Sequence, residues 1–271
     1  MDKATWSGIF LALGGIVAGL LLEGGNLSQV LQPTAAMIVF GGTLGAVLIQ
    51  FPLGVVFEAF QRLANVFFEP KRNPKELVEQ LVKYAFKARK EGIIALDSEL
   101  ETIEDPFLKK ALMLAVDGTE PQELRKMMEL EIDNQAEHDD KVPGVFESAG
   151  GFAPTIGIIG AVLGLIQVMQ HLDKIDEVGR GIAVAFVATI YGVGSANLFF
   201  LPAAGKMRIR IRGEQNIREM TLEGVTAIME GINPRMLEAK LVSFFAQMQR
   251  KGTQTQEGKI NATQEASGAT R

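Results

Sequence analysis

Four apolar stretches, two on each side of a long charged segment, constrain the fold of this chain more than any other feature. They cover residues 4–22, 34–57, 151–170 and 182–203, and none of them contains an Asp, Glu, Lys or Arg. A helix of about 20 apolar residues crosses a bilayer, because lipid offers the backbone no hydrogen-bond partner. The pattern therefore predicts an all-α, polytopic membrane protein with four transmembrane helices and a helical cytoplasmic domain.

Basic residues beside these stretches predict the orientation in the membrane. The connection at 23–33 has no Lys or Arg, and the connection at 171–181 has two. Basic residues gather instead after the second and fourth stretches, near Arg62 and Lys206. By the positive-inside rule, both termini and the charged segment lie in the cytoplasm. We expect the first stretch to stay as a membrane helix, because no small-residue cleavage pattern follows it before Asn26.

Composition and motifs argue against an enzyme. The chain has no cysteine, which excludes disulfides, thiol catalysis and cysteine-based zinc sites. Its mildly acidic balance gives no nucleic-acid signal, and no phosphate-binding loop or Ser/His/Asp arrangement is present. His138 and His171 lie too far apart in sequence for a metal-binding pair. The acidic run at 137–140 is interpreted as a solvated helix end, with a bound cation as the alternative. No cofactor or metal is predicted.

The chain is expected to divide into five parts. Residues 1–60 and 151–204 hold the transmembrane pairs, 61–150 a helical cytoplasmic insert, 205–250 cytoplasmic C-terminal helices, and 251–271 a disordered tail. Four helices are predicted in the insert, beginning near Pro74, Ile93, Pro106 and Pro121. In the first of these, helical spacing places one set of apolar side chains inward: Leu77, Val78, Leu81, Val82, Ala85 and Phe86. Asn233 and Pro234 predict the start of a last helix that runs to residue 249.

Small residues are frequent in the apolar stretches. They include the pairs Gly15/Gly19 and Gly41/Gly45, three glycines in the third stretch, and a run of small residues from Gly192 in the fourth. Small residues let helices in lipid approach closely, so we interpret these faces as helix–helix contacts. They exceed what four helices need for one another, which suggests contacts with further subunits.

Three residues of the third and fourth stretches suggest function. Pro154 and Pro202 lie near the cytoplasmic boundary, and each removes a backbone hydrogen bond. They are interpreted either as helix ends or as a pair of hinges that couple the membrane to the cytoplasmic domain. Thr189 lies near the middle of the membrane. Its hydroxyl either bonds its own helix or lines an ion path.

Several motifs match a known family: KARKEGIIAL at 87–96, DPF at 105–107, APTIG at 153–157, GLI at 164–166 and GINPR at 231–235. With its two pairs of spans around a large insert, the chain resembles the MotA/PomA family of bacterial flagellar stator subunits, over nearly its whole length to about residue 249. The resemblance implies a multi-pass protein of the bacterial inner membrane. It implies a ring of five copies around a dimer of a MotB-like partner, which has one span with an ion-binding Asp and a peptidoglycan-binding domain.

The resemblance also assigns roles to single residues. Ion flow would drive rotation of the ring, and charged residues of the insert would act on a FliG-like rotor switch protein. Arg89 matches the family's torque arginine, and Asp97 stands where most members have Glu. Glu99 could share the acidic role, and Glu131 matches a further charged position. Pro154, Pro202 and Thr189 match family positions in the third and fourth spans.

The same resemblance bears on the ion. Sodium-driven members tend to carry Thr where this chain has Ala161, and proton-driven members tend to carry Ala or Gly. Because Ala offers no oxygen to a partly dehydrated Na⁺, we expect proton coupling. The spans contain no carboxylate, so the chain cannot hold the translocated ion alone. The partner is expected to supply the acid.

Three alternatives compete with this interpretation. An ExbB/TolQ-like energizer of outer-membrane processes uses similar logic, but those proteins have three spans, and the fourth span and Asn233-Pro234 argue against it. A secondary transporter would show an internal repeat, and none is visible. A purely structural membrane scaffold would need neither Thr189 nor the two prolines.

Overall fold

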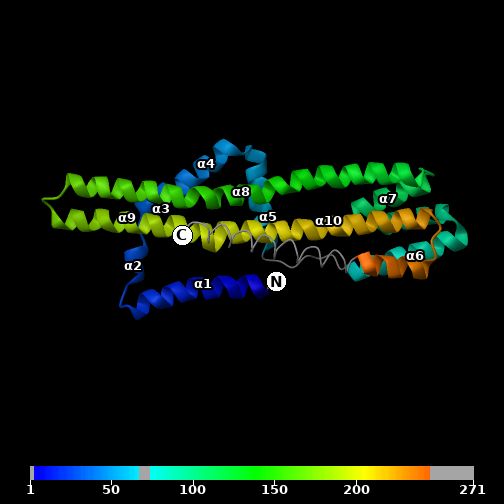
Figure 1. Cartoon of the computed structure of the whole chain (residues 1–271), viewed down its shortest axis with the longest axis horizontal. Coiled ribbons are helices and arrows are strands. Elements are labelled where there is room, and N and C mark those ends of the chain that lie inside the picture. Colours follow the sequence, from blue (N-terminus) through cyan, green and yellow to red (C-terminus); the bar gives the residue numbers. More distant parts are fainter. Residues whose placement is uncertain (1–2, 67–73, 245–271) are drawn as a thin grey trace, which may run out of the picture. The chain divides into compact units, whose positions relative to one another are not determined.

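The structure is a computed structural model, and it describes residues 3–66 and 74–244. This part of the chain is helical and contains no strand, which confirms the all-α prediction (Figure 1). Four helical segments are long and apolar enough to cross a membrane, within Thr5–Leu22, Pro33–Gln50, Pro121–Gln170 and Ile175–Met229. The predicted tail at 251–271 and the end of the predicted last helix lie outside the described residues.

Two compact units make up the chain, which passes between them at 70/71, 136/137 and 211/212. The first unit contains the apolar stretches, and the second contains most of the charged insert and the C-terminal residues. The boundaries expected at 60/61, 150/151 and 204/205 follow hydropathy and stay predictions, because backbone contacts, and not hydropathy, define these units.

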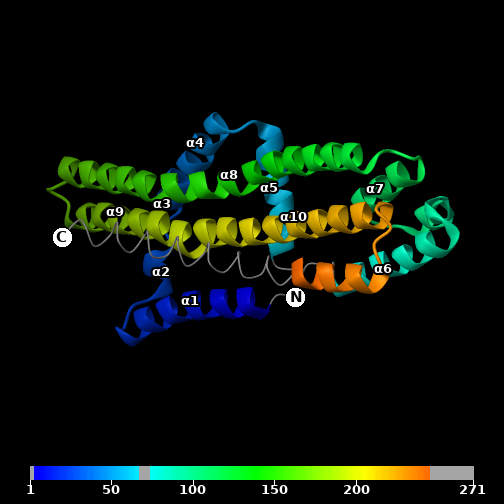
Figure 2. The ribbon, with the colours of Figure 1, turned by 45° about the vertical axis from the view of Figure 1, so that its right-hand side comes forward.

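The first unit begins with α1 (Lys3–Leu22), whose large apolar side chains, such as Phe10 and Leu11, are exposed. In both ribbon views α1 stands apart from α8 and α9 (Figure 1, Figure 2). Asn26 caps the short α2 (Leu27–Val30) through a capping box, and α2 leads to the second span. Apolar side chains exposed on a helix of this length suit contact with lipid.

The second span is interrupted, contrary to the prediction of one helix at 34–57. It consists of α3 (Pro33–Ala36), the π-helical η1 (Met37–Gly41) and α4 (Gly42–Gln50), and α5 (Leu53–Val66) begins after a break. Phe51 has φ −119° and ψ 143°, an extended conformation. Pro52 explains the break, because proline disfavours a helical conformation in the preceding residue.

The third and fourth spans belong to two long helical runs. α8 (Pro121–Gln170) has 50 residues and includes Pro143 and Pro154 in its interior. α9 (Ile175–Ser195), the π-helical η3 (Ala196–Phe200) and α10 (Leu201–Met229) follow one another directly. The boundary expected at residue 151 therefore falls inside one helix. A helix can pass from water into lipid without ending, because its backbone hydrogen bonds are internal.

Small residues hold α8 and α9 together as an antiparallel pair (Figure 1). A Cβ atom added at Gly192 would lie 2.5 Å from the backbone oxygen of Ala153, and one at Gly164 would lie 2.8 Å from that of Gly181. These contacts confirm the predicted packing faces of the two spans. In contrast, a Cβ atom at Gly15, Gly19, Gly41 or Gly45 would meet nothing within 4 Å, so these four glycines make no close helix contact within the described residues.

The apolar core of the second unit surrounds Leu81, Leu112 and Met128. It is built from α6 (Pro74–Glu91), the 3-10 helix η2 (Ile93–Thr102), α7 (Pro106–Val116), the start of α8, the end of α10 and residues 234–244. Asp105 caps α7 by accepting a hydrogen bond from the backbone of Phe107, and α7 begins at Pro106 as predicted. The predicted helix at Ile93 is of the tighter 3-10 type.

Phe86 contradicts the predicted inward face of α6. Its side chain is 55% exposed, whereas Leu81 and Ala85 are buried in the core. Residues at 81 and 85 are one turn apart and share a face, and residue 86 is rotated past the edge of that face. Helical spacing alone did not locate the edge.

Candidate functional site

The first candidate site is a basic surface at the end of α6. Arg89 and Lys90 lie in the last turn, where positive charge is favoured by the helix dipole, and both are exposed. A groove of about 480 Å³ runs beside them, lined by Lys83, Phe86, Lys87, Arg89, Lys90 and Glu91. Arg89 makes no ion pair within the described residues. This guanidinium is therefore available to a partner.

The two acidic candidates of η2 differ in their surroundings. Glu99 accepts a hydrogen bond from Lys87 at 2.7 Å and lies 3.5 Å from Lys83. The hydrogen bond from Lys87 lowers the pKa of Glu99. Asp97 is exposed and has no ion-pair partner among the described residues. The structure thus holds Glu99 against α6 and leaves Asp97 free for contact with another molecule.

Glu131 lies on α8 and forms an ion pair with Lys110 of α7. Both partners of this pair are partly exposed. Of the four predicted rotor-contact residues, Arg89 and Asp97 are exposed and unpaired in the described chain, while Glu99 and Glu131 each have an intramolecular partner.

Another charged group in the second unit was not predicted. Glu223 on α10 lies 2.9 Å from Arg125 on α8 and also pairs with Lys240. Burial alone would raise the pKa of Glu223, but the hydrogen bonds from Lys240 and Arg125 outweigh it, so that the pKa is lowered. The same bond to Glu223 raises the pKa of Arg125. This group ties α8, α10 and residues 234–244 together.

The second candidate site is the α8–α9 pair in the membrane. Thr189 is half-buried, and its hydroxyl donates to the backbone oxygen of Ala185 at 3.2 Å. A Cβ atom at Gly157 would lie 3.5 Å from the Cα atom of Thr189, so the two helices are in contact beside this threonine. Ala161 is half-buried one turn further along α8. The bond within its own helix is the commoner role of a membrane threonine.

The two predicted hinge prolines do not end their helices. Pro154 lies inside α8 beside Ala153, whose backbone oxygen faces Gly192. Pro202 follows η3, where the N–H of Leu201 donates to the oxygen of Ala196 across a π turn. Such wide turns often mark functional sites. The helix-end interpretation is wrong for Pro154, whereas Pro202 lies in the first turn of α10 after η3, and the action of both as hinges stays a prediction.

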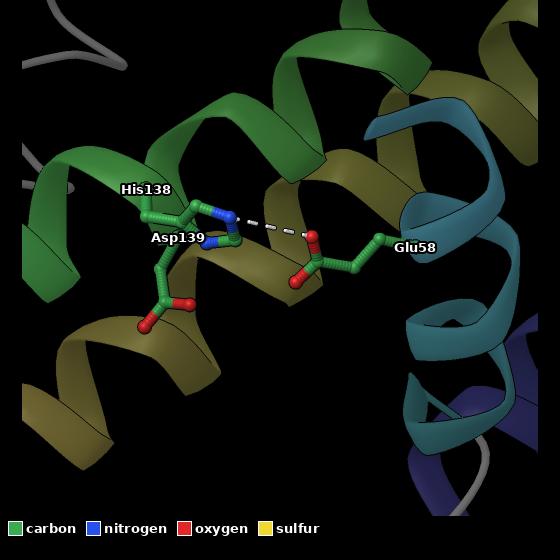
Figure 3. A group of neighbouring side chains, drawn as sticks. All are labelled: Glu58, His138 and Asp139. Carbon is green, nitrogen blue, oxygen red and sulfur yellow. Dashed lines mark ion pairs between the residues drawn. The ribbon is translucent and has the colours of Figure 1, made fainter. Parts of the chain in front are cut away.

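A cluster of charged side chains between α5 and α8, in the first unit, was not predicted from the sequence. Glu58 on α5 lies 3.6 Å from His138 on α8, and the adjacent Asp139 is buried (Figure 3). Arg62 contacts Asp139 at 2.6 Å and Glu58 at 2.7 Å. The interpretation of 137–140 as a solvated helix end is therefore wrong for Asp139.

This cluster has three possible metal ligands, Glu58, His138 and Asp139. The guanidinium of Arg62 already bonds both carboxylates, and a cation would have to displace it. The arrangement fits an ion-pair clamp between α5 and α8. A second clamp joins α10 to α8, because Arg208 contacts Glu147 at 2.7 Å.

Comparison with known proteins decides the family. A family model described as "Motility protein A N-terminal" matches residues 6–92, and one described as "MotA/TolQ/ExbB proton channel family" matches residues 99–220. Motility protein A of Bacillus subtilis (strain 168) is 35% identical over 245 residues, which cover 90% of this chain and 91% of that protein. This chain belongs to the motility protein A (MotA) family.

Other MotA-family proteins match over a similar length. Chemotaxis protein PomA of Vibrio alginolyticus is 32% identical, covering 92% of this chain and 98% of that protein. The solved structure of C. jejuni MotAB matches with a TM-score of 0.86 at 34% identity, over 90% of this chain and 96% of that one. The flagellar MotAB stator complex from Bacillus subtilis matches with a TM-score of 0.83 over 92% and 99%. The predicted resemblance is confirmed.

The comparisons favour the MotA family over the ExbB/TolQ alternative. The channel model at 99–220 is shared with TolQ and ExbB, so it does not separate the two. The model at 6–92 describes the MotA N-terminus, which includes the first two spans and α6. The charged surface around Arg89 thus lies within the part of the chain that resembles MotA proteins specifically.

Proposed function

We propose that this chain is a stator subunit of the flagellar motor, which forms a proton channel with a single-span, MotB-like partner. The observation that carries the proposal is the match of nearly the whole chain to MotAB stator complexes. The composition of the four spans supports the proposal. They contain no carboxylate, so a partner must supply the one that an ion path needs. The motility-protein names of the relatives point the same way.

The partner is expected to carry an intramembrane Asp and a peptidoglycan-binding domain that fixes the complex to the cell wall. Five copies of this chain would surround a partner dimer. The face of α8 and α9 with Ala161 and Thr189 would line the path of the ion. A Cβ atom at Gly15 or Gly41 would meet nothing within 4 Å in the part of the chain that the structure describes, which supports the proposal of contacts between subunits.

Proton flow would turn the ring and act on a FliG-like rotor switch protein. Arg89 and Asp97 are the side chains best placed to make this contact, because both are exposed and unpaired within the described residues. A single exposed charge pair contributes only about 0–1 kcal/mol. Several such pairs can steer an engagement that must form and release quickly. Basic residues at Arg62 and Lys206 support an inner-membrane topology with cytoplasmic termini.

A proton-leak assay tests the need for a partner. The chain is expressed alone and together with the single-span protein, and the cytoplasmic pH is followed after an external acid pulse. Only the pair should conduct, because only the partner brings a carboxylate into the membrane. Acidification by this chain alone would refute the two-subunit channel.

Swimming tests the coupling ion and the torque surface. Swimming speed should follow the proton gradient and should not change with external sodium at fixed pH, because Ala161 offers sodium no ligand.

Arg89→Glu should impair torque while the complex still assembles. Lys126→Glu is the matched control, since Lys126 is an exposed cation of the same unit outside the α6 groove. Normal swimming by the Arg89→Glu strain would contradict the electrostatic role.

A further inference from the structure

Phe86 is an exposed aromatic residue in the middle of a basic surface. Its side chain is 55% exposed and lines the groove of about 480 Å³ beside α6. Four of the other lining residues are cations: Lys83, Lys87, Arg89 and Lys90. Beyond Gly92, the next turn of chain places Ile94 on the surface as well, with 73% of its side chain exposed.

The fold of the second unit does not account for this position. The core contact of α6 is made by Leu81, Tyr84 and Ala85, which are buried, so the helix is fixed without Phe86. Isolated exposed apolar residues are ordinary. An aromatic side chain inside a groove with a charged rim is different, because this is the arrangement of a binding hot spot: a central anchor surrounded by polar contacts.

The charges of the groove indicate the chemistry of its partner. Lys87 forms an ion pair with Glu99, with 2.7 Å between the two side chains. Arg89 and Lys90, which also line the groove, make no ion pair within the described residues, so their positive charges can pair with carboxylates of a partner. A complementary surface would carry carboxylates around an apolar depression wide enough for a phenyl ring.

We propose that Phe86 is the apolar anchor of the rotor-facing surface, and that it packs into an apolar depression rimmed by carboxylates on the rotor switch protein. This inference rests on the proposed function and adds a residue that the charge pattern does not reveal. Charge pairs supply rapid, salt-sensitive encounter, whereas burial of a phenyl ring supplies affinity that salt does not screen. The two contributions are therefore separable by ionic strength.

A binding measurement separates them. The complete complex of this chain with its single-span partner, held in lipid nanodiscs, is titrated with the purified rotor switch protein. The titration is done at low salt and at about 1 M salt, where the screening length falls to about 3 Å. Phe86→Ala should weaken binding about tenfold at both salt concentrations, a typical hot-spot loss. Arg89→Ala should weaken binding at low salt only.

Two further variants make the test specific. Phe86→Leu keeps an apolar side chain and should restore most of the affinity. Met236→Ala removes a side chain that is 67% exposed in the same unit but outside the groove, and should bind like the wild type. Wild-type binding by Phe86→Ala, or a loss confined to low salt, would overturn the anchor while leaving the stator function intact. If neither Phe86→Ala nor Arg89→Ala changes binding, the rotor-facing assignment of the whole surface fails.

Discussion

Arg62 on α5 lies 2.6 Å from the carboxylate of Asp139 on α8, and Asp139 is 1% exposed. The same guanidinium reaches Glu58, one turn earlier on α5, at 2.7 Å. A buried carboxylate is costly to leave without a partner, so this contact fixes α5 against α8. The clamp joins the segment that follows the second span to the helix that enters the third.

Loss of the cation should be worse than loss of both charges. Arg62→Ala removes the guanidinium that contacts the buried Asp139 carboxylate, and should lower the free energy of unfolding by about 2 kcal/mol or more. The double variant Arg62→Leu/Asp139→Leu should recover part of that loss, because no charge remains buried. Thermal unfolding of the purified complex measures both.

An exposed pair provides the control for this comparison. Lys126 and Glu123 lie 3.3 Å apart, but their side chains are 73% and 61% exposed. Lys126→Ala should therefore change stability by less than about 0.5 kcal/mol. If Arg62→Ala is as mild as Lys126→Ala, the clamp has no structural importance.

Asp97 and Glu99 should respond differently to neutralisation. Asp97→Asn should reduce torque without changing the stability of the protein, because Asp97 is exposed and unpaired in the described residues. Glu99→Gln releases Lys83 and Lys87, so it should lower the melting temperature slightly. Torque is measured on a tethered bead, and melting by circular dichroism. A torque loss with Glu99→Gln and none with Asp97→Asn would reverse the assignment.

Glu223 should make the second unit sensitive to acid. Its pKa is lowered in the folded protein, so its stabilising contribution is complete above the unfolded value of about 4.3 and is lost as the pH falls through the folded value. Melting temperature should therefore decline below about pH 4.3, and less steeply in Glu223→Gln. Lys240→Met removes one of the two partners that lower the folded pKa of Glu223, so its decline should be shallower than that of the wild type. Parallel profiles for wild type and both variants would exclude this role.

Gly192 should tolerate no side chain. A Cβ atom there would lie 2.5 Å from the backbone oxygen of Ala153, and backbone atoms of two packed helices cannot easily move apart. Gly192→Ala should destabilise the membrane unit by about 1–3 kcal/mol, the usual cost of overpacking. Gly194→Ala is the matched control, because a Cβ atom there meets nothing within 4 Å. Equal melting temperatures for the two variants would disprove close packing of α8 on α9.

Local patterns predicted many features of the fold. Hydropathy located the four spans, Pro106 and Asn233 marked helix starts, and the glycines of the third and fourth stretches indicated a close helix pair. Each of these depends on a residue and its neighbours in sequence. Motif resemblance singled out Arg89, because the matching residues are contiguous, and the structure shows this residue exposed in the last turn of α6.

Predictions that depended on distant residues were less successful. The acidic composition of the run at 137–140 predicts a solvated helix end, but Asp139 is buried against Arg62, which lies far away in sequence. Asp97 and Glu99 are two residues apart and chemically alike, and only the positions of Lys83 and Lys87 on α6 separate them. Phe86 was placed inward, since helical spacing does not show how wide the buried face is.

The sequence by itself determined that this chain crosses a membrane four times, lacks a carboxylate for an ion path of its own, and belongs among the flagellar stator subunits. These conclusions follow from composition, spacing and motif, which do not depend on packing. Only the tertiary structure decided which charges are free and which are paired, that α8 continues unbroken through Pro154, and that Phe86 faces outward. The physical reason is that burial and ion pairing are set by segments distant along the chain, and these meet only when the helices pack.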